Sequence, residues 1–96
     1  MGYSLYIVAC ADGTLYTGIA TDVARRLIEH NGGHTPGSKG KGARYTSARR
    51  PVVLVYEAAF ATRSEASKEE ARIKRLTRPE KERLIQAARG ADALRS

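Results

Sequence analysis

Two β-type patterns open the chain. Residues 3–10 combine aromatic, β-branched and aliphatic side chains and predict a strand, and residues 14–19 predict a second one. The Asp12-Gly13 pair between them is a turn signal. The two strands are therefore expected to form an antiparallel hairpin.

A helical pattern follows the hairpin. Either Thr21 or Asp22 can cap its first turn, and Gly32-Gly33 is expected to end it. Its predicted apolar face, which should lie against the sheet, is made of Val23, Leu27 and Ile28.

The second half of the chain predicts one strand and two helices. Pro51 precedes a nearly continuous apolar run over residues 52–60, a pattern typical of a strand covered on both faces. Two capping boxes then open two helices. These boxes are Thr62 with Glu65, for a helix to about Leu76, and Thr77 with Glu80, for a helix to about Gly90.

The resulting order is β-β-α-β-α-α, in the α/β (α+β) class, with a small antiparallel or mixed sheet that carries the helices. A chain of 96 residues has room for a single domain, which is expected over residues 1–90. Residues 91–96 are expected to be a frayed tail.

Charge narrows the choice of partners. Lys and Arg number 17 against 10 acidic residues, for a net charge of +7, and no acidic residue lies between Asn31 and Tyr56. Residues 32–50 are glycine-rich, basic and nearly free of aliphatic side chains, which is typical of a functional or disordered loop. The basic stretch favours a polyanionic partner, although a solvated loop without a partner would have the same composition.

Several classes of protein do not fit this sequence. No stretch approaches the roughly 18 apolar residues of a membrane span, and the N-terminus lacks a signal-peptide pattern. The basic residues do not form an amphipathic helix that would lie on a membrane, so we expect a cytoplasmic protein with no membrane partner. Cys10 is the only cysteine, and its apolar surroundings in the sequence predict a buried thiol rather than a reactive one. Without a Cys or His pair at ligand spacing, a structural zinc site is not expected.

One carboxylate stands where a core residue is expected. Ala66, Glu70 and Ile73 share a helical stripe, and burial of a lone carboxylate is unfavourable unless it is paired or coordinates a metal. Glu70 could instead pair with an arginine. Alternatively, the true stripe is Glu69, Ile73 and Leu76, with Glu70 at its rim.

Other polar residues also stand near predicted apolar faces. Arg26 and His30 lie one helical turn apart, where a cation and an imidazole could hold a phosphate or simply form an exposed edge. Tyr6 and Tyr16 lie on the two arms of the hairpin, where core packing is the ordinary role of a tyrosine.

Together these residues resemble the GIY-YIG nuclease superfamily, most closely its small stand-alone bacterial members. Its two half-motifs correspond to Ser4-Leu5-Tyr6 and Tyr16-Thr17-Gly18, in which Ser-Leu and Thr replace Gly-Ile and the central Ile. Further similar segments follow in the family's order: residues 21–27 with His30-Asn31, residues 41–46, residues 51–56, and Glu65-Ala66 with Glu70 and Ile73-Lys74. The resemblance covers residues 3–85 and implies a three-stranded antiparallel sheet with helices packed around it.

The resemblance implies a metal ligand and a phosphate ligand. Glu70 would hold one divalent cation, Mg²⁺ with Mn²⁺ as the alternative, because a single carboxylate suits an ion that keeps most of its waters. Arg26 would bind the scissile phosphate and offset its transition-state charge. Arg25 is one residue off the family's spacing and is expected to point elsewhere.

The same resemblance assigns the proton chemistry. The family's active tyrosines fall on Tyr6 and Tyr16, of which Tyr16 is the first choice for general base and Tyr6 would orient the attacking water. His30 would be either a proton relay or a phosphate contact.

The implied activity is hydrolysis of phosphodiester bonds in nucleic acid, with DNA as the first choice, in DNA repair or processing. The basic loop would hold phosphates rather than bases beside the cut, giving little sequence specificity but allowing selection by shape. Its expected contact residues are Lys39, Lys41, Arg44, Tyr45, Arg49 and Arg50. Two rivals are a non-catalytic nucleic-acid-binding module of the same fold, which the altered first half-motif favours, and a basic protein-interaction domain.

The length of the hairpin turn decides whether Tyr6 and Tyr16 can share a site. Side chains alternate between the faces of a sheet, and paired residues in a hairpin have a constant index sum. A two-residue turn would place the tyrosines on opposite faces. A three-residue loop pairs Tyr6 with Gly18, and it also pairs Tyr16 with Val8, so that both rings share one face. A two-tyrosine site therefore predicts the longer loop, with Gly13 at positive φ.

Overall fold

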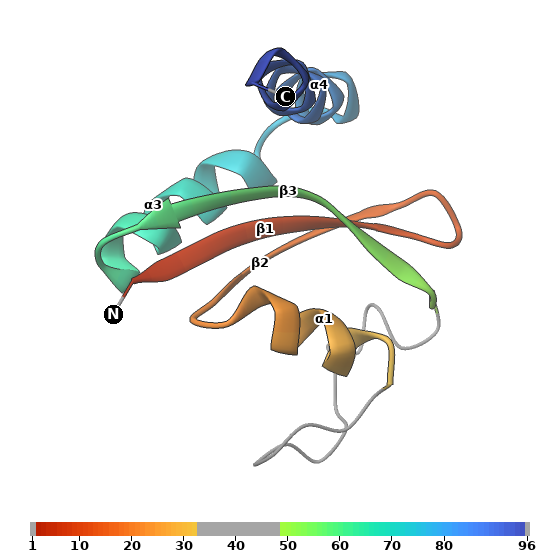
Figure 1. The fold of residues 1–96 in the computed structure, drawn as a ribbon, viewed down its shortest axis with the longest axis horizontal. Coiled ribbons are helices and arrows are strands. Elements are labelled where there is room, and N and C mark those ends of the chain that lie inside the picture. Colours follow the sequence, from red (N-terminus) through yellow and green to blue (C-terminus); the bar gives the residue numbers. More distant parts are fainter. Residues whose placement is uncertain (1, 33–48, 96) are drawn as a thin grey trace.

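The computed structural model contains three strands and three helices in the predicted order, within the residues that it describes (Figure 1). These are residues 2–32 and 49–95, with residues 89–95 described by their backbone only. The elements are β1 (Tyr3–Cys10), β2 (Leu15–Ala20), α1 (Val23–His30), β3 (Val52–Phe60), α3 (Arg63–Lys74) and α4 (Arg78–Arg95). The strands form an antiparallel sheet in the order β2-β1-β3, so the predicted class and element order are confirmed.

The central strand β1 carries the core on both of its faces. On one face Val8 packs in a cluster with Val23 of α1, and on the other Ile7 packs in a cluster with Ile73 of α3 and Ile85 of α4. Helix α1 therefore covers one face of the sheet, and α3 and α4 lie on the other (Figure 1).

Strand β3 contributes side chains to the clusters on both faces of the sheet, as its apolar run predicted. Val52 and Leu54 pack in the cluster with α1, and Val55 and Tyr56 pack in the cluster with α3 and α4. The strand lies at an edge of the sheet and Val53 is 59% exposed, so β3 is less completely covered than the central strand β1.

The hairpin has the three-residue loop that a shared tyrosine site requires. The Cys10 amide donates to the Thr14 carbonyl at 2.8 Å, and the Gly13 amide donates to the Cys10 carbonyl at 2.9 Å. Gly13 has a φ of 86°, a conformation that is easy for glycine and strained for residues with a Cβ. Tyr6 pairs with Gly18, and Tyr16 pairs with Val8, which confirms the predicted register.

Helix α1 packs against the sheet through two of its three predicted apolar residues, Val23 and Leu27. Asp22 caps it, accepting a hydrogen bond from the Arg25 amide at 3.0 Å. Val23 and His30 are buried, whereas Ile28 is 48% exposed, so its place on the apolar face was wrong. Val23, Leu27 and His30 are spaced i, i+4, i+7, and this row faces the sheet.

Both capping boxes begin helices as predicted. Thr62 accepts from the Glu65 amide at 3.2 Å, and the Thr77 amide donates to the Glu80 carboxylate at 3.0 Å. The end of α4 was predicted wrongly, because the helix runs past Gly90. A single glycine in a helix costs about 1 kcal/mol relative to alanine, which is too little to stop a helix. No helix in the described part of the chain combines the length and apolar character that crossing a membrane requires.

Candidate active site

Two tyrosines and a histidine gather on the face of the sheet that α1 covers. The Tyr6 hydroxyl and His30 Nε2 are 2.7 Å apart. The ring centroids lie 5.7 Å apart for Tyr6 and His30, and 5.3 Å apart for Tyr16 and His30. His30 and Tyr6 are buried, and Tyr16 is half-buried. The tyrosines come from the hairpin and the histidine from the end of α1, so the sheet–helix contact assembles the cluster.

Gly18 makes room for the Tyr6 ring. A Cβ at position 18 would lie 2.7 Å from the Tyr6 hydroxyl oxygen and 2.8 Å from the ring carbon that carries it. Real Cβ atoms do not approach other atoms so closely, so any side chain here would displace the phenol. The glycine of the second half-motif therefore positions the tyrosine of the first.

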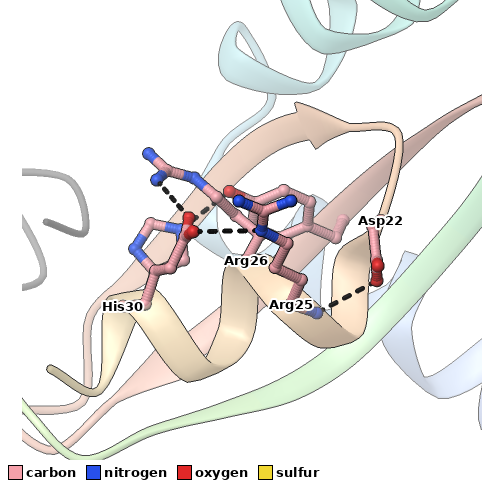
Figure 2. Close-up of polar contacts among 6 residues, drawn as sticks. Asp22, Arg25, Arg26 and His30 are labelled. Carbon is pink, nitrogen blue, oxygen red and sulfur yellow. Dashed lines mark hydrogen bonds and ion pairs between the residues drawn. The ribbon is translucent and has the colours of Figure 1, made fainter. Parts of the chain in front are cut away.

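Arg26 joins this cluster to a carboxylate that sequence reasoning missed. Its side chain is 31% exposed and hydrogen-bonds the Tyr6 hydroxyl. Its ion pair with Glu29, at 3.1 Å, is drawn as a dashed line in Figure 2. Burial alone would lower the pKa of Arg26, but its hydrogen bonds to Glu29 and Tyr6 raise that pKa overall. Glu29 is only 8% exposed. Its spacing from Arg26 (i+3) and from Arg25 (i+4) is the sequence signal that could have revealed it.

Arg25 does not point away from the site as the sequence suggested. Its Nε lies 3.4 Å from the second oxygen of Glu29, so the guanidinium groups of Arg25 and Arg26 meet at one carboxylate (Figure 2). Both spacings, i,i+4 and i,i+3, bring side chains together on one side of a helix. Adjacent residues on a helix can therefore share a partner even though their Cβ atoms diverge.

Burial sets the charge state of the cluster. Burial, followed by the positive charge of Arg26, lowers the pKa of His30 to about 4, so the imidazole is neutral at pH 7. Burial, followed by the neighbouring Tyr16, raises the pKa of Tyr6 to about 12. The Tyr6 oxygen accepts from Arg26, which can only donate. Since the phenol and the imidazole are both neutral at pH 7, one of the two groups donates to the other across the 2.7 Å contact.

Glu70 lies at the rim of the buried stripe of α3. Ala66 and Ile73 have no exposed surface, whereas the Glu70 side chain is 24% exposed and lies 3.4 Å from Lys74. A lysine, not an arginine, is its partner. Its negative charge is among the influences that raise the pKa of Tyr6, so it acts on the cluster although its helix packs on the opposite face. Glu69 is similarly exposed, at 25%, and pairs with Arg72.

Two of the predicted loop contacts have structural partners. Arg49 pairs with Asp12 in the hairpin loop at 2.9 Å, and Arg50 donates to the His30 carbonyl at 2.7 Å. These contacts tie the end of the basic loop to the scaffold. The other predicted contacts, Lys39, Lys41, Arg44 and Tyr45, lie outside the described residues.

Comparison with known proteins identifies the family. The profile of the GIY-YIG catalytic domain matches residues 2–83. The chain belongs to the GIY-YIG family. GIY-YIG domains form a superfamily of nucleases, and membership implies a nucleic acid substrate.

Bacterial GIY-YIG relatives share most of the chain. It is 56% identical over 84 residues to a UPF0213 protein of Desulfotalea psychrophila, covering 88% of this chain and 71% of that one. It is 52% identical over 82 residues to a UPF0213 protein of Staphylococcus epidermidis, covering 85% and 92% of the two chains.

Solved structures of related proteins have the same GIY-YIG fold. The solution structure of a UPF0213 protein from Bacillus halodurans matches with 41% sequence identity and a TM-score of 0.56. The match covers 91% of this chain and 85% of that protein's chain. A solution structure from E. faecalis is 38% identical, with a TM-score of 0.59, and covers 93% and 88% of the two chains. The β-β-α-β-α-α arrangement is thus shared across these relatives.

Proposed function

We propose that the protein is a metal-dependent endonuclease that hydrolyses phosphodiester bonds in DNA with little sequence specificity, in DNA repair or processing. The observation that supports it most is the contact of Arg26 with the Tyr6–His30 pair. A cation that can neutralise a phosphate is thereby held beside two phenols and an imidazole that can handle protons.

The donors near this cluster fit a hydrated magnesium ion. The described residues contain no group of three or more His, Cys, Asp or Glu side chains that could hold a metal by themselves. Glu70 supplies one partly exposed carboxylate, and its charge acts on Tyr6. Mg²⁺ accepts such a site because it retains waters and takes phosphate oxygens from the substrate, and Mn²⁺ would substitute. The bound ion would act as a Lewis acid on the phosphate.

Each of the four groups of the cluster then has one task. Tyr6 keeps its proton near neutral pH, since its pKa is about 12, and so orients water rather than activating it. Tyr16 would take the proton of the attacking water as general base, in the phenolate form that the positive charges of the bound ion and Arg26 favour. Arg26 binds the scissile phosphate, and Arg26→Ala should slow cleavage by roughly 10²-fold or more. His30 has no exposed surface, which favours a relay or positioning role through Tyr6 over direct phosphate contact.

A pair of neighbouring glutamates offers a matched test of the metal site. Glu70→Gln should abolish cleavage in Mg²⁺ or Mn²⁺, because it removes the carboxylate that holds the ion, while binding to DNA in EDTA stays nearly unchanged. Glu69→Gln makes the same charge change at an equally exposed, equally ion-paired position. The Glu69 variant should cut normally. The assay compares single-stranded, flapped and branched DNA with and without the metal.

Three results would contradict the proposal. Normal cleavage by the Glu70 variant with loss in the Glu69 variant would move the metal ligand to the neighbouring position. Cleavage that persists in EDTA would remove the metal requirement. Tight binding of DNA without cleavage in either metal would favour the non-catalytic binding module.

A further inference from the structure

A hollow lies directly beside Arg26, between the end of β2 and the first half of α1. Its volume is about 330 Å³, and it is lined by residues 19–22 together with Arg25, Arg26 and Glu29. Its size is at the lower end of the range of small-ligand sites, which starts near roughly 300 Å³. It therefore has room for a small part of a nucleic acid strand.

The lining of this hollow carries two cations and two carboxylates, and both cations meet at the same carboxylate. Arg25 lies 3.4 Å and Arg26 3.1 Å from the two oxygens of Glu29, so two cations share one anion. Asp22, the other carboxylate of the lining, accepts a hydrogen bond from the Arg25 amide at the start of the helix. The two guanidinium groups repel each other, and Glu29 lies between them and offsets that repulsion. A second anion beside Arg25 would be stabilised by the same geometry, because guanidinium groups bind carboxylate and phosphate alike.

We propose that this hollow binds the phosphate adjacent to the scissile phosphate, with Arg25 as its ligand, and that Glu29 acts as a competing anion in the free protein. The inference rests on the proposed function, since it takes Arg26 as the ligand of the scissile phosphate. Arg26 contacts both the Tyr6 hydroxyl and Glu29, and thus connects the two sites. A strand whose scissile phosphate lies on Arg26 brings its next phosphate to the neighbouring guanidinium.

The chain contains a matched control for this pair. Arg78 and Glu82 on α4 form an ion pair with the same i,i+4 spacing at 3.0 Å, and both side chains are about half exposed. They do not line the hollow. Variants at the two pairs change the net charge equally, so general electrostatic attraction to a polyanion cancels in the comparison.

The first experiment measures equilibrium binding of a fluorescent single-stranded oligonucleotide in EDTA. EDTA removes the metal ion that the proposed cleavage requires, so the oligonucleotide stays intact during the measurement. Arg25→Gln should weaken binding about tenfold, as expected for one charge-assisted hydrogen bond. It should also reduce the slope of log affinity against log salt by about 0.7. Arg78→Gln should have a much smaller effect on both. Glu29→Gln should strengthen binding several-fold more than Glu82→Gln, because it removes the competing anion.

Equal losses in the two arginine variants would overturn the inference. So would weaker binding in Glu29→Gln, because Glu29 would then be needed to hold Arg25 rather than compete with the phosphate.

A second experiment locates the phosphate. Flapped DNA, whose junction fixes the register of the bound strand, is prepared with one uncharged methylphosphonate linkage at each successive position and should bind the wild type more weakly when the neutral linkage falls at the Arg25 position. Arg25→Gln should be insensitive to that linkage alone. Cleavage of the unmodified flapped DNA then shows whether this linkage is next to the cut. If no linkage behaves in this way, the inference fails although cleavage is intact. If cleavage is absent but one linkage responds, the Arg25 site stands and the proposed nuclease activity fails.

Discussion

At the scale of a residue, the absence of a side chain at Gly18 decides where the Tyr6 ring can lie. A Cβ at position 18 would approach the Tyr6 hydroxyl oxygen to 2.7 Å. Gly18→Ala should push the phenol away from His30 and Arg26 and lower the cleavage rate sharply. Its cost in the free energy of unfolding should be about 1–3 kcal/mol, as for an overpacked core. Cleavage assays and urea unfolding measure the two effects separately.

Gly13→Ala is the control for that substitution. Gly13 has a φ of 86°, and a Cβ there would meet no atom within 4 Å. The alanine should therefore cost about 1–2 kcal/mol of backbone strain in the hairpin loop and leave the tyrosine cluster in place. Equal loss of cleavage in both variants would mean that activity tracks stability, and not the position of Tyr6.

At the scale of elements, Asn31 joins α1 to β3. Its side-chain amide donates to the Val52 carbonyl at 3.1 Å, and its oxygen accepts from the Val52 amide at 2.7 Å. The side chain thus replaces the strand neighbour that an edge residue lacks. Because α1 carries His30 next to Asn31, the same bonds hold the histidine against the sheet.

Replacing Asn31 should loosen this junction. Asn31→Ala removes both hydrogen bonds and should cost about 2 kcal/mol in the free energy of unfolding, at about 1 kcal/mol for each bond. Asn31→Asp retains an acceptor for the Val52 amide and loses the donor to the Val52 carbonyl. Its cost in urea unfolding should fall between those of wild type and alanine. A neutral effect of Asn31→Ala would show that packing alone holds α1 to β3.

At the scale of the whole molecule, one buried histidine links stability to pH. The pKa of His30 is lowered by burial and by Arg26 to about 4, from 6.5 in the unfolded chain. Below pH 6.5 the unfolded state binds a proton that the folded state does not, so stability falls as the pH drops toward 4. Between pH 7.5 and 5.0 this loss should be about 2 kcal/mol.

The variant His30→Gln should lack this pH dependence. Urea unfolding at pH 7.5 and 5.0 measures it in a window above the pKa values of ordinary carboxyl groups, which therefore contribute little. The variant is expected to be less stable than wild type at pH 7.5 and to lose little further stability at pH 5.0. An equal loss in both proteins would assign the pH dependence to other groups.

The sequence alone determined the local features of this protein. Asp22, Thr62 and Thr77 cap their helices, and the loop ending in Gly13 has the predicted length, because capping and turn geometry depend on residues within a few positions of one another. Alternation along the two strands left two hairpin registers open, and the requirement that Tyr6 and Tyr16 share a face selected the one that the structure has. The candidate site residues came from the resemblance to a family, and their catalytic roles stay predictions.

The tertiary structure decided what depends on contacts between distant residues. It placed β1 at the centre of the sheet, and it exposed Ile28 while burying His30. The Tyr6–His30 bond spans 24 positions, and no local pattern reports such a contact. Glu29 looked like an ordinary surface acid until the fold showed it between two guanidinium groups. The reason is physical. The pattern of apolar residues indicates which side of an element is buried, whereas the pairing and packing of whole elements decide which polar groups are buried together.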